Sequence, residues 1–364
     1  MAIVLLFFLL FIPLFALIGV YAERKVSAFM QDRLGPMEVG KYGLLQTLAD
    51  ILKLIMKEDI IPTAANKILF TLAPVVMFAS IFAGFAIIPL GPEFIGSSAA
   101  VGVFFLLAIV ALDIIGVLMA GWGSNNKYSL YGAMRAAAQM VSYEVPMGLS
   151  VLAAVMISQS LDLQEISMQQ GIFASEVGTT NYLFGLKATG IDVSQWGGIF
   201  TWNVFKAPFL LVAFVIFFIA SLAESNRAPF DLPEAESELI AGYIIEYSGA
   251  RFAFMMLAEY AAMLLVSLLA SILFLGGWNT PLPNIGSFAL ADWTSGTMGE
   301  ISAILWGIFW LMGKAILLVF VQMWVRWTYP RLRVDQLMGL CWKYLTPISL
   351  VIVFIAGVWR LLMI

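Results

Sequence analysis

The sequence predicts an all-α, polytopic membrane protein with about eight transmembrane helices. Of its 364 residues, 62% are hydrophobic and only 12% are charged, which is about half the charged share of a typical soluble domain. The apolar residues occur in runs close to the roughly 20 residues that a helix needs to cross the hydrocarbon core of a bilayer. We therefore expect residues 1–364 to form a single integral membrane domain, with one amphipathic surface helix and a charged cytoplasmic loop.

Eight apolar stretches mark the expected spans. They cover residues 1–22, 70–90, 101–121, 136–158, 205–223, 252–277, 301–325 and 344–364. We do not expect the first stretch to be a signal peptide, because no basic residue precedes it and Glu23, Arg24 and Lys25 follow it where a cleavage site would be. The remaining segments give cytoplasmic loops at about 23–69, 122–135, 224–251 and 326–343, and a long outer loop at about 159–204.

The distribution of basic residues predicts the orientation. Fifteen of the 19 Lys and Arg residues lie in the loops that follow the first, third, fifth and seventh spans. By the positive-inside rule these loops face the cytoplasm. Both termini are then expected on the outer side of the membrane.

The segment 44–57 has the pattern of a helix that lies along the membrane surface. Gln46, Asp50, Lys53 and Lys57 share one helical face, while leucines and an isoleucine share the other. Such a helix could flank an opening for a lipid-soluble molecule, or it could serve only as a surface anchor.

The composition limits the redox chemistry of this chain. It has no histidine and one cysteine, Cys341. This excludes a bis-His haem, a Cys-ligated iron–sulfur cluster held by this chain alone, and a Cys/His zinc site. If electrons move here, another chain carries them.

Ionisable residues within or beside the apolar spans are candidate functional groups, because charge in hydrocarbon is costly. They are Asp113, Glu144, Glu224, Glu259 and Lys314. The alternative for each is a buried group that is paired for structure. As a set, carboxylates in low dielectric can exchange protons near neutral pH, which a proton relay requires.

The densest group of acids lies in the sequence LAESNRAPFDLPEAESEL at 222–239. It contains Glu224, Asp231, Glu234, Glu236 and Glu238, opposed only by Arg227. Like charges this close should titrate as a coupled set. A solvated acidic loop is the competing interpretation, but the apolar sequence LIAGYIIEY at 239–247 indicates that the loop packs inward together with Glu246.

Five stretches of the chain resemble a known family, which comprises subunit 1 of mitochondrial complex I and the H subunit of bacterial NADH:quinone oxidoreductase. They are ERKVSAFMQDRLGPMEVGKYGLLQTLADILKLIMKED from residue 23, GWGSNNKYSLYGAMRAAAQMVSYEVP from 121, LAESNRAPFDLPEAESEL from 222, EYSGARFAFMMLAEYAAM from 246 and WVRWTYPRLRVDQLM from 324. They occur in order across nearly the whole chain.

The resemblance implies a heel-like membrane subunit of the bacterial cytoplasmic membrane, with a chamber that a ubiquinone or menaquinone enters from the bilayer. The chain itself is expected to hold no cofactor and no catalytic or metal-ligating residue. Flavin and iron–sulfur clusters would lie in partner subunits, which include the subunit with the terminal cluster, a soluble quinone-site subunit, small membrane subunits and antiporter-like subunits.

The resemblance also implies roles for individual residues. The residues of the quinone tunnel and chamber are Arg24, Lys25, Arg33, Asp50, Arg227 and Asp231. The residues of the path that couples quinone reduction to proton translocation are Glu144, Glu224, Glu234, Glu236, Glu238, Glu246 and Glu259, with Asp113 and Lys314 added from their positions within spans.

Two other functions fit parts of the pattern. The first is the homologous subunit of a membrane-bound energy-converting hydrogenase or of another relative of complex I, which neighbouring genes would distinguish. The second is a stand-alone ion-coupled transporter, which also carries acidic residues within its spans. A transporter would be active as a lone chain, whereas the cytoplasmic loops here suit docking of a large soluble partner.

Overall fold

The computed structural model describes residues 2–92, 94–175, 177–185, 190, 192–194, 196–233, 236–284, 288–295 and 299–363. Within these ranges the regular elements are helices, and no strand is present. The longer helices are α1 (Ala2–Met30), α2 (Gln46–Met56), α3 (Lys67–Gly84), α4 (Gly102–Val110), α5 (Leu112–Gly123), α6 (Lys127–Ser158), α9 (Pro208–Glu224), α11 (Gly249–Phe274), α13 (Glu300–Thr328) and α15 (Thr346–Met363). The prediction of an all-α protein is confirmed.

Short helices connect or extend these elements. They are α7 (Leu163–Met168), α8 (Asn203–Lys206), α10 (Glu236–Leu239), α12 (Leu290–Ser295), α14 (Val334–Gly339) and the 3₁₀ turn η7 (Gly242–Ile244). A π-helical turn, η8 (Leu340–Leu345), joins α14 to α15.

Seven helical segments in the described part of the chain are long and apolar enough to cross a membrane. They are α1, α3, α4 with α5, α6, α11, α13, and α14 with α15. The eighth expected span corresponds to α9, which has 17 residues. At 1.5 Å per residue it is about 25 Å long, a little shorter than the roughly 30 Å hydrocarbon core. It begins three residues later than expected, because Pro208 lacks a backbone N–H and suits the first helical position.

Several helices extend beyond their apolar stretch. α1 continues to Met30, so Glu23, Arg24 and Lys25 are helical rather than part of a loop that starts at 23. α6 begins at Lys127, where the Asn126 side chain accepts a hydrogen bond from the Tyr128 N–H at 2.9 Å. An apolar run in the sequence predicts only the part of a helix that lies in hydrocarbon. The helix itself continues as far as its residues are capped or packed against neighbouring segments.

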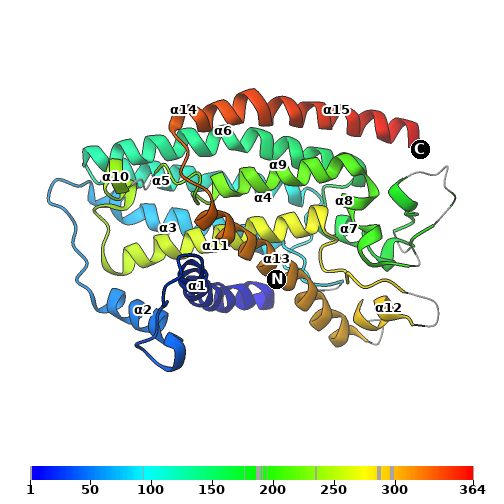
Figure 1. Ribbon diagram of the computed structural model, residues 1–364, viewed down its shortest axis with the longest axis horizontal. Helices are drawn as coiled ribbons and strands as arrows, with labels where there is room; N and C mark the ends of the chain where they lie inside the picture. The colour runs from blue at the N-terminus through cyan, green and yellow to red at the C-terminus, as the bar shows by residue number, and fades with distance from the viewer. Residues whose placement is uncertain are drawn as a thin grey trace.

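The helices form stacked layers along the long axis of the molecule (Figure 1). α15 packs on α6 and α9, α6 packs on α5, and α5 packs on α3. α11 follows, and it also contacts α1, α2 and α13. From Tyr260 to Phe274 every residue of α11 is buried, so α11 is the central helix of the fold.

The two ends of the molecule differ. The left end in Figure 1, here called the cavity end, holds α2, α10 and the loops on either side of α2, residues 31–45 and 57–66. The right end, here called the opposite end, holds α7, α8, α12 and the C-terminus. The predicted amphipathic helix is present as α2, which packs on α1 and α11. Its apolar residues Leu48, Leu52 and Ile55 are exposed, as expected for a surface that faces lipid or a partner subunit.

We predict that Gly132→Ala lowers the thermal stability of the detergent-purified chain. A Cβ on Gly132 of α6 would lie 2.7 Å from the Gly242 Cα and 2.8 Å from the Tyr243 N, backbone atoms that cannot move aside without displacing η7. Overpacking of this kind costs about 1–3 kcal/mol. The matched control is Gly148→Ala on the same helix, where a Cβ meets nothing within 4 Å and stability should be unchanged or higher. Equal melting temperatures for the two variants would contradict close packing of α6 on η7.

Candidate functional site

A cavity of about 690 Å³ lies at the cavity end, between α1, α2, α11 and α13. Its walls are mainly apolar, with Leu17 and Val20 from α1, Ile51 and Leu54 from α2, and Met256 from α11. On α2 the lining positions Thr47, Ile51 and Leu54 follow helical spacing. This volume falls within the range of small-molecule sites, which combine apolar walls with a few placed polar groups.

The polar group of this cavity is centred on Glu23, which is only 5% exposed. The Arg227 Nη1 donates to both carboxylate oxygens of Glu23, at 3.1 and 3.0 Å. The Tyr260 hydroxyl donates to Oε2 at 2.6 Å, and Arg326 forms a second ion pair with Glu23. We call these four residues the Glu23 cluster. It joins α1, the segment after α9, α11 and α13.

Arg227 is held as a charged donor in this cluster. Burial alone would lower its pKa, but the nearby Glu23, together with Tyr260 and Glu259, raises the pKa above its usual value. Its guanidinium carbon lies 4.5 Å from the centre of the Tyr260 ring. The Nε and Nη2 atoms are buried and have no hydrogen-bond partner within the described ranges, and the residue borders the cavity.

The basic residues predicted for a tunnel entrance divide into two groups. Arg24 and Asp50 line the cavity and form an ion pair at 2.6 Å between α1 and α2. Arg33 also lines it. Lys25 is not among the lining residues. Its Nζ donates to the Pro36 carbonyl oxygen at 2.8 Å, which fastens the following loop to α1.

The acidic loop after α9 packs inward at several points. Asp231 forms an ion pair with Arg331 at 2.9 Å. Burial raises its pKa, although Arg331 opposes this shift. Glu238 is more than half exposed and pairs with Arg135 of α6 at 2.5 Å. Neither Asp231 nor Glu238 lines the cavity. Glu234 and the side chain of Glu236 lie outside the described residues.

Four further carboxylates lie on the membrane-spanning helices, one of them at the cavity wall. Glu259 lines the cavity and accepts a hydrogen bond from the Tyr243 hydroxyl at 3.1 Å. Asp113 of α5 lies within electrostatic range of Glu259, and Glu224 lies within range of Asp113 and Glu144. Both carboxylate oxygens of Glu224 are buried without a hydrogen-bond partner in the part of the chain that the structure describes. We call Glu259, Asp113, Glu224 and Glu144 the acidic row.

Two predicted residues lie away from this row. Glu246 accepts a hydrogen bond from the Asn126 amide at 2.6 Å, at the start of α6. Lys314 lies at the opposite end, where its Nζ donates to the carbonyl oxygens of Leu275, Gly277 and Asn279 at 2.7–2.9 Å. It also lies 4.4 Å from the Trp202 ring centre. In this position Lys314 caps the C-terminal end of α11.

Three members of the Glu23 cluster are absent from the site residues that the sequence predicts. Glu23 enters the prediction only as part of the charged stretch that ends the first span. Tyr260 follows the predicted Glu259 directly, and Arg326 lies in the fifth motif that resembles the complex I family. The signal for all three is their position within family-like motifs, because no local pattern connects residues so far apart in the chain.

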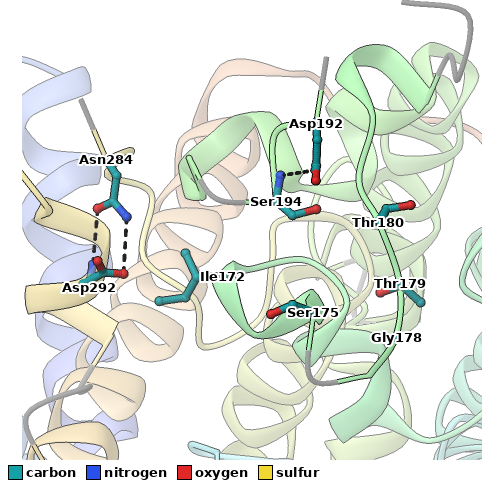
Figure 2. A pocket seen from close by; sticks show the side chains of 9 residues that line it. All are labelled: Ile172, Ser175, Gly178, Thr179, Thr180, Asp192, Ser194, Asn284 and Asp292. Carbon is teal, nitrogen blue, oxygen red and sulfur yellow. Dashed lines mark hydrogen bonds between the residues drawn. The ribbon is translucent and has the colours of Figure 1, made fainter. Parts of the chain in front are cut away.

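A separate cavity of about 590 Å³ lies at the opposite end, in the long loop after α6. Figure 2 shows its small polar side chains, among them Ser175 and Thr180, and the Asn284 and Asp292 side chains that bond to each other. Asp192 accepts a hydrogen bond from the Ser194 N–H at 2.8 Å. This cavity has no acidic row beside it and lacks the apolar walls of the first.

Comparisons with known proteins agree over almost the whole chain. A family model described as NADH dehydrogenase matches residues 2–357. The chain is 62% identical over 357 residues to an H subunit of NADH-quinone oxidoreductase, numbered 2, of Cytophaga hutchinsonii, covering 98% of each chain. It is 53% identical over 354 residues to the NADH-quinone oxidoreductase H subunit of Chlorobium luteolum, covering 97% of this chain and 87% of that relative. The corresponding H subunit of Polaromonas naphthalenivorans is 44% identical over 337 residues, covering 93% of this chain and 84% of that relative.

We predict that Glu23→Ala destabilises the protein by about 3–5 kcal/mol, because it leaves the buried guanidinium group of Arg227 and the part-buried one of Arg326 without their counter-charge. The matched control is Asp50→Ala, which breaks the more exposed Arg24 pair and should cost about 0–1 kcal/mol. Thermal denaturation of the purified variants in one detergent measures both effects. A larger loss for Asp50→Ala would show that the Glu23 cluster is not the main polar contact between these helices.

Proposed function

This chain belongs to the NADH dehydrogenase family, as an H subunit of NADH-quinone oxidoreductase, and from this premise we propose that it forms the quinone chamber and access tunnel of complex I. It also couples quinone reduction to proton translocation through the acidic row. The chain is thus a multi-pass membrane subunit of an enzyme complex, and the electron carriers belong to partner subunits.

The observation that carries this proposal is the cavity with the Glu23 cluster. A quinone has a ring with carbonyl oxygens, which accept hydrogen bonds, and a long apolar tail. The arginines that line the cavity, Arg227 and Arg326, are hydrogen-bond donors that suit the carbonyls, and the aliphatic walls from α1, α2 and α11 suit the tail. Pro13 and Leu17 line the cavity from the apolar part of α1, which supports access from within the bilayer.

The acidic row provides a route for coupling. Quinone reduction takes up electrons and protons, so the charge in the cavity changes during each turnover. Glu259 borders the cavity and interacts with Asp113, which interacts with Glu224. Asp113 and Glu224 are buried, while Glu259 is part-buried at the cavity wall. Interacting carboxyl groups titrate as a set, so a change in the protonation of one alters the others. We infer that this coupling passes the charge change laterally toward the pumping subunits. Glu234, Glu236, Glu238 and Glu246 stay in the proposed path as its cytoplasmic part.

The orientation and partners follow from the same proposal. The basic loops at the cavity end face the cytoplasm, and both termini face outward. The subunit with the terminal iron–sulfur cluster docks at the cavity end, and antiporter-like subunits continue the acidic row.

Purification from the native membrane in mild detergent tests the assembly. We expect flavin, iron–sulfur and antiporter-like subunits by mass spectrometry, together with inhibitor-sensitive NADH:quinone activity. Co-purification of a nickel-type hydrogenase large subunit would select the hydrogenase relative instead. Recovery of a lone, active chain would favour a transporter.

We predict that Ile51→Trp, which fills the cavity from α2, raises the KM for quinone at least severalfold. Oxidation of NADH by a water-soluble artificial acceptor should not change, because that reaction does not need the cavity. The matched control is Leu48→Trp on the same helix, whose side chain is exposed and lies outside the cavity lining. Equal quinone kinetics for the two variants would place the quinone elsewhere.

We also predict that Glu224→Gln or Glu144→Gln slows or uncouples quinone reduction, because an amide keeps the shape of the carboxyl group but cannot exchange a proton. Proton translocation per quinone reduced, measured in membrane vesicles, should fall severalfold while artificial-acceptor activity remains. The control is Glu300→Gln at the exposed start of α13, at the opposite end, which should leave both activities unchanged. Loss of both activities in Glu224→Gln would indicate failed assembly.

A further inference from the structure

A second polar cavity lies at the opposite end of the molecule, far from the Glu23 cluster along the spans. It has a volume of about 430 Å³ and is enclosed by the end of α6, the loop 178–185, α8 and the end of α15. Gly178, Thr179 and Thr180 line both this cavity and the one in Figure 2, so this segment of the loop separates the two. We call it the α8–α15 pocket.

Two cations converge on the α8–α15 pocket. Lys206 ends α8, and its Nζ donates to the Asn181 Oδ1 at 2.8 Å. Arg360 on α15 donates from Nη2 to the Gln159 Oε1 at 2.7 Å. The Arg360 Nε is buried and has no hydrogen-bond partner within the described ranges. Burial, assisted by the charge of Arg360, lowers the pKa of Lys206 to about 8. An anion bound in the pocket would stabilise the charged form of Lys206 and so oppose both the burial and the repulsion by Arg360.

One acid also lines the pocket but is engaged elsewhere. Glu165 accepts a hydrogen bond from the Ser160 hydroxyl at 2.6 Å and a longer one from Gln169 at 3.4 Å. The lining therefore carries two cations and one carboxylate whose oxygens are already occupied. This charge balance favours an anionic ligand.

The position of the pocket indicates what kind of anion it meets. α9 begins beside it and α15 ends beside it, and both helices expose apolar residues that would face lipid, including Leu211 and Val215 on α9 and Phe354 and Val358 on α15. Trp359 lines the pocket and packs edge-on against Phe209 with ring centres 5.7 Å apart. Tryptophan and arginine at the end of a span are typical of the membrane interface.

We propose that the α8–α15 pocket binds the phosphate group of an anionic phospholipid between Lys206 and Arg360, with the acyl chains lying along α9 and α15. This site is independent of the quinone chamber. Free inorganic phosphate carries the same negatively charged oxygens as a lipid phosphate group. The two ligands differ because only the lipid has acyl chains that can bind the apolar faces of α9 and α15.

The test uses the purified, delipidated complex and a phosphatidylglycerol that carries a photoactivatable group in one acyl chain. After irradiation, peptide mapping should place the label on α9 and α15 near the pocket. Arg360→Gln should raise the lipid concentration that gives half-maximal labelling by about fivefold, and Lys206→Gln should do the same, since each basic residue contributes about that factor to binding of anionic lipid. Arg360→Lys, which keeps the charge, should restore most of the labelling.

The control is Lys343→Gln, an exposed cation of η8 at the cavity end, which should label like the unmodified complex. Competition identifies the ligand: unlabelled phosphatidylglycerol should displace the probe, whereas inorganic phosphate at the same concentration should not. Equal displacement by phosphate would assign the pocket to a free anion and overturn the lipid proposal. Equal labelling by a phosphatidylcholine probe, or labelling unaffected by Arg360→Gln, would overturn it as well. If Lys206→Gln fails to assemble, the more accessible Arg360 variant decides the result.

Discussion

Glu23 binds Arg227, Arg326 and the Tyr260 hydroxyl at the point where four separate parts of the chain meet. Glu23, Arg227 and Tyr260 are buried beside the cavity, so these three groups cannot turn to water for an alternative partner. A carboxylate shared by two guanidinium groups and a phenol satisfies the charge locally. The same contacts fix α1 and α13 against α11, which sets the width of the cavity. The quinone chamber proposed here therefore depends on the Glu23 cluster in two ways: the cluster supplies its polar groups and holds together the helices that form its walls.

The central position of α11 explains how the cavity and the acidic row can be coupled. Its first half carries Glu259 and Tyr260 at the cavity wall, and its second half is wholly buried. Lys314 binds the carbonyl groups just after the end of this helix, which holds α11 to α13 at the opposite end. Because α11 is held at both ends, we expect a change of charge at Glu259 to act on its neighbours electrostatically rather than by movement of the helix. This favours a row of interacting acids over a large displacement as the means of coupling.

The sequence predicts the helical class, the surface helix and several site residues, because each leaves a local pattern. Apolar runs of the right length indicate the spans, and the spacing of Asp50, Lys53 and Lys57 indicates α2. The Glu23 cluster has no local pattern, since its hydrogen bonds join residues 204, 237 and 303 positions apart. Helix ends are also misplaced, as in α1 and α6, because hydropathy reports contact with hydrocarbon while helix length depends on capping and packing. Which acids lie next to one another, as Glu224 lies near Asp113, is likewise a tertiary property.

The contrast between Glu23 and Glu224 separates a structural acid from a candidate proton carrier. Both are buried, but Glu23 has three donors, whereas the oxygens of Glu224 have no partner within the described ranges. A buried carboxylate surrounded by cations is stable only in its charged form. Removing one of its cationic partners therefore destabilises the structure. A buried carboxyl group without fixed donors, beside other acids, is not tied to one cationic partner, so its protonation depends on the state of its neighbours. Proton transfer needs the second kind of group, so the acidic row, rather than the more strongly bonded Glu23 cluster, is where coupling should be sought.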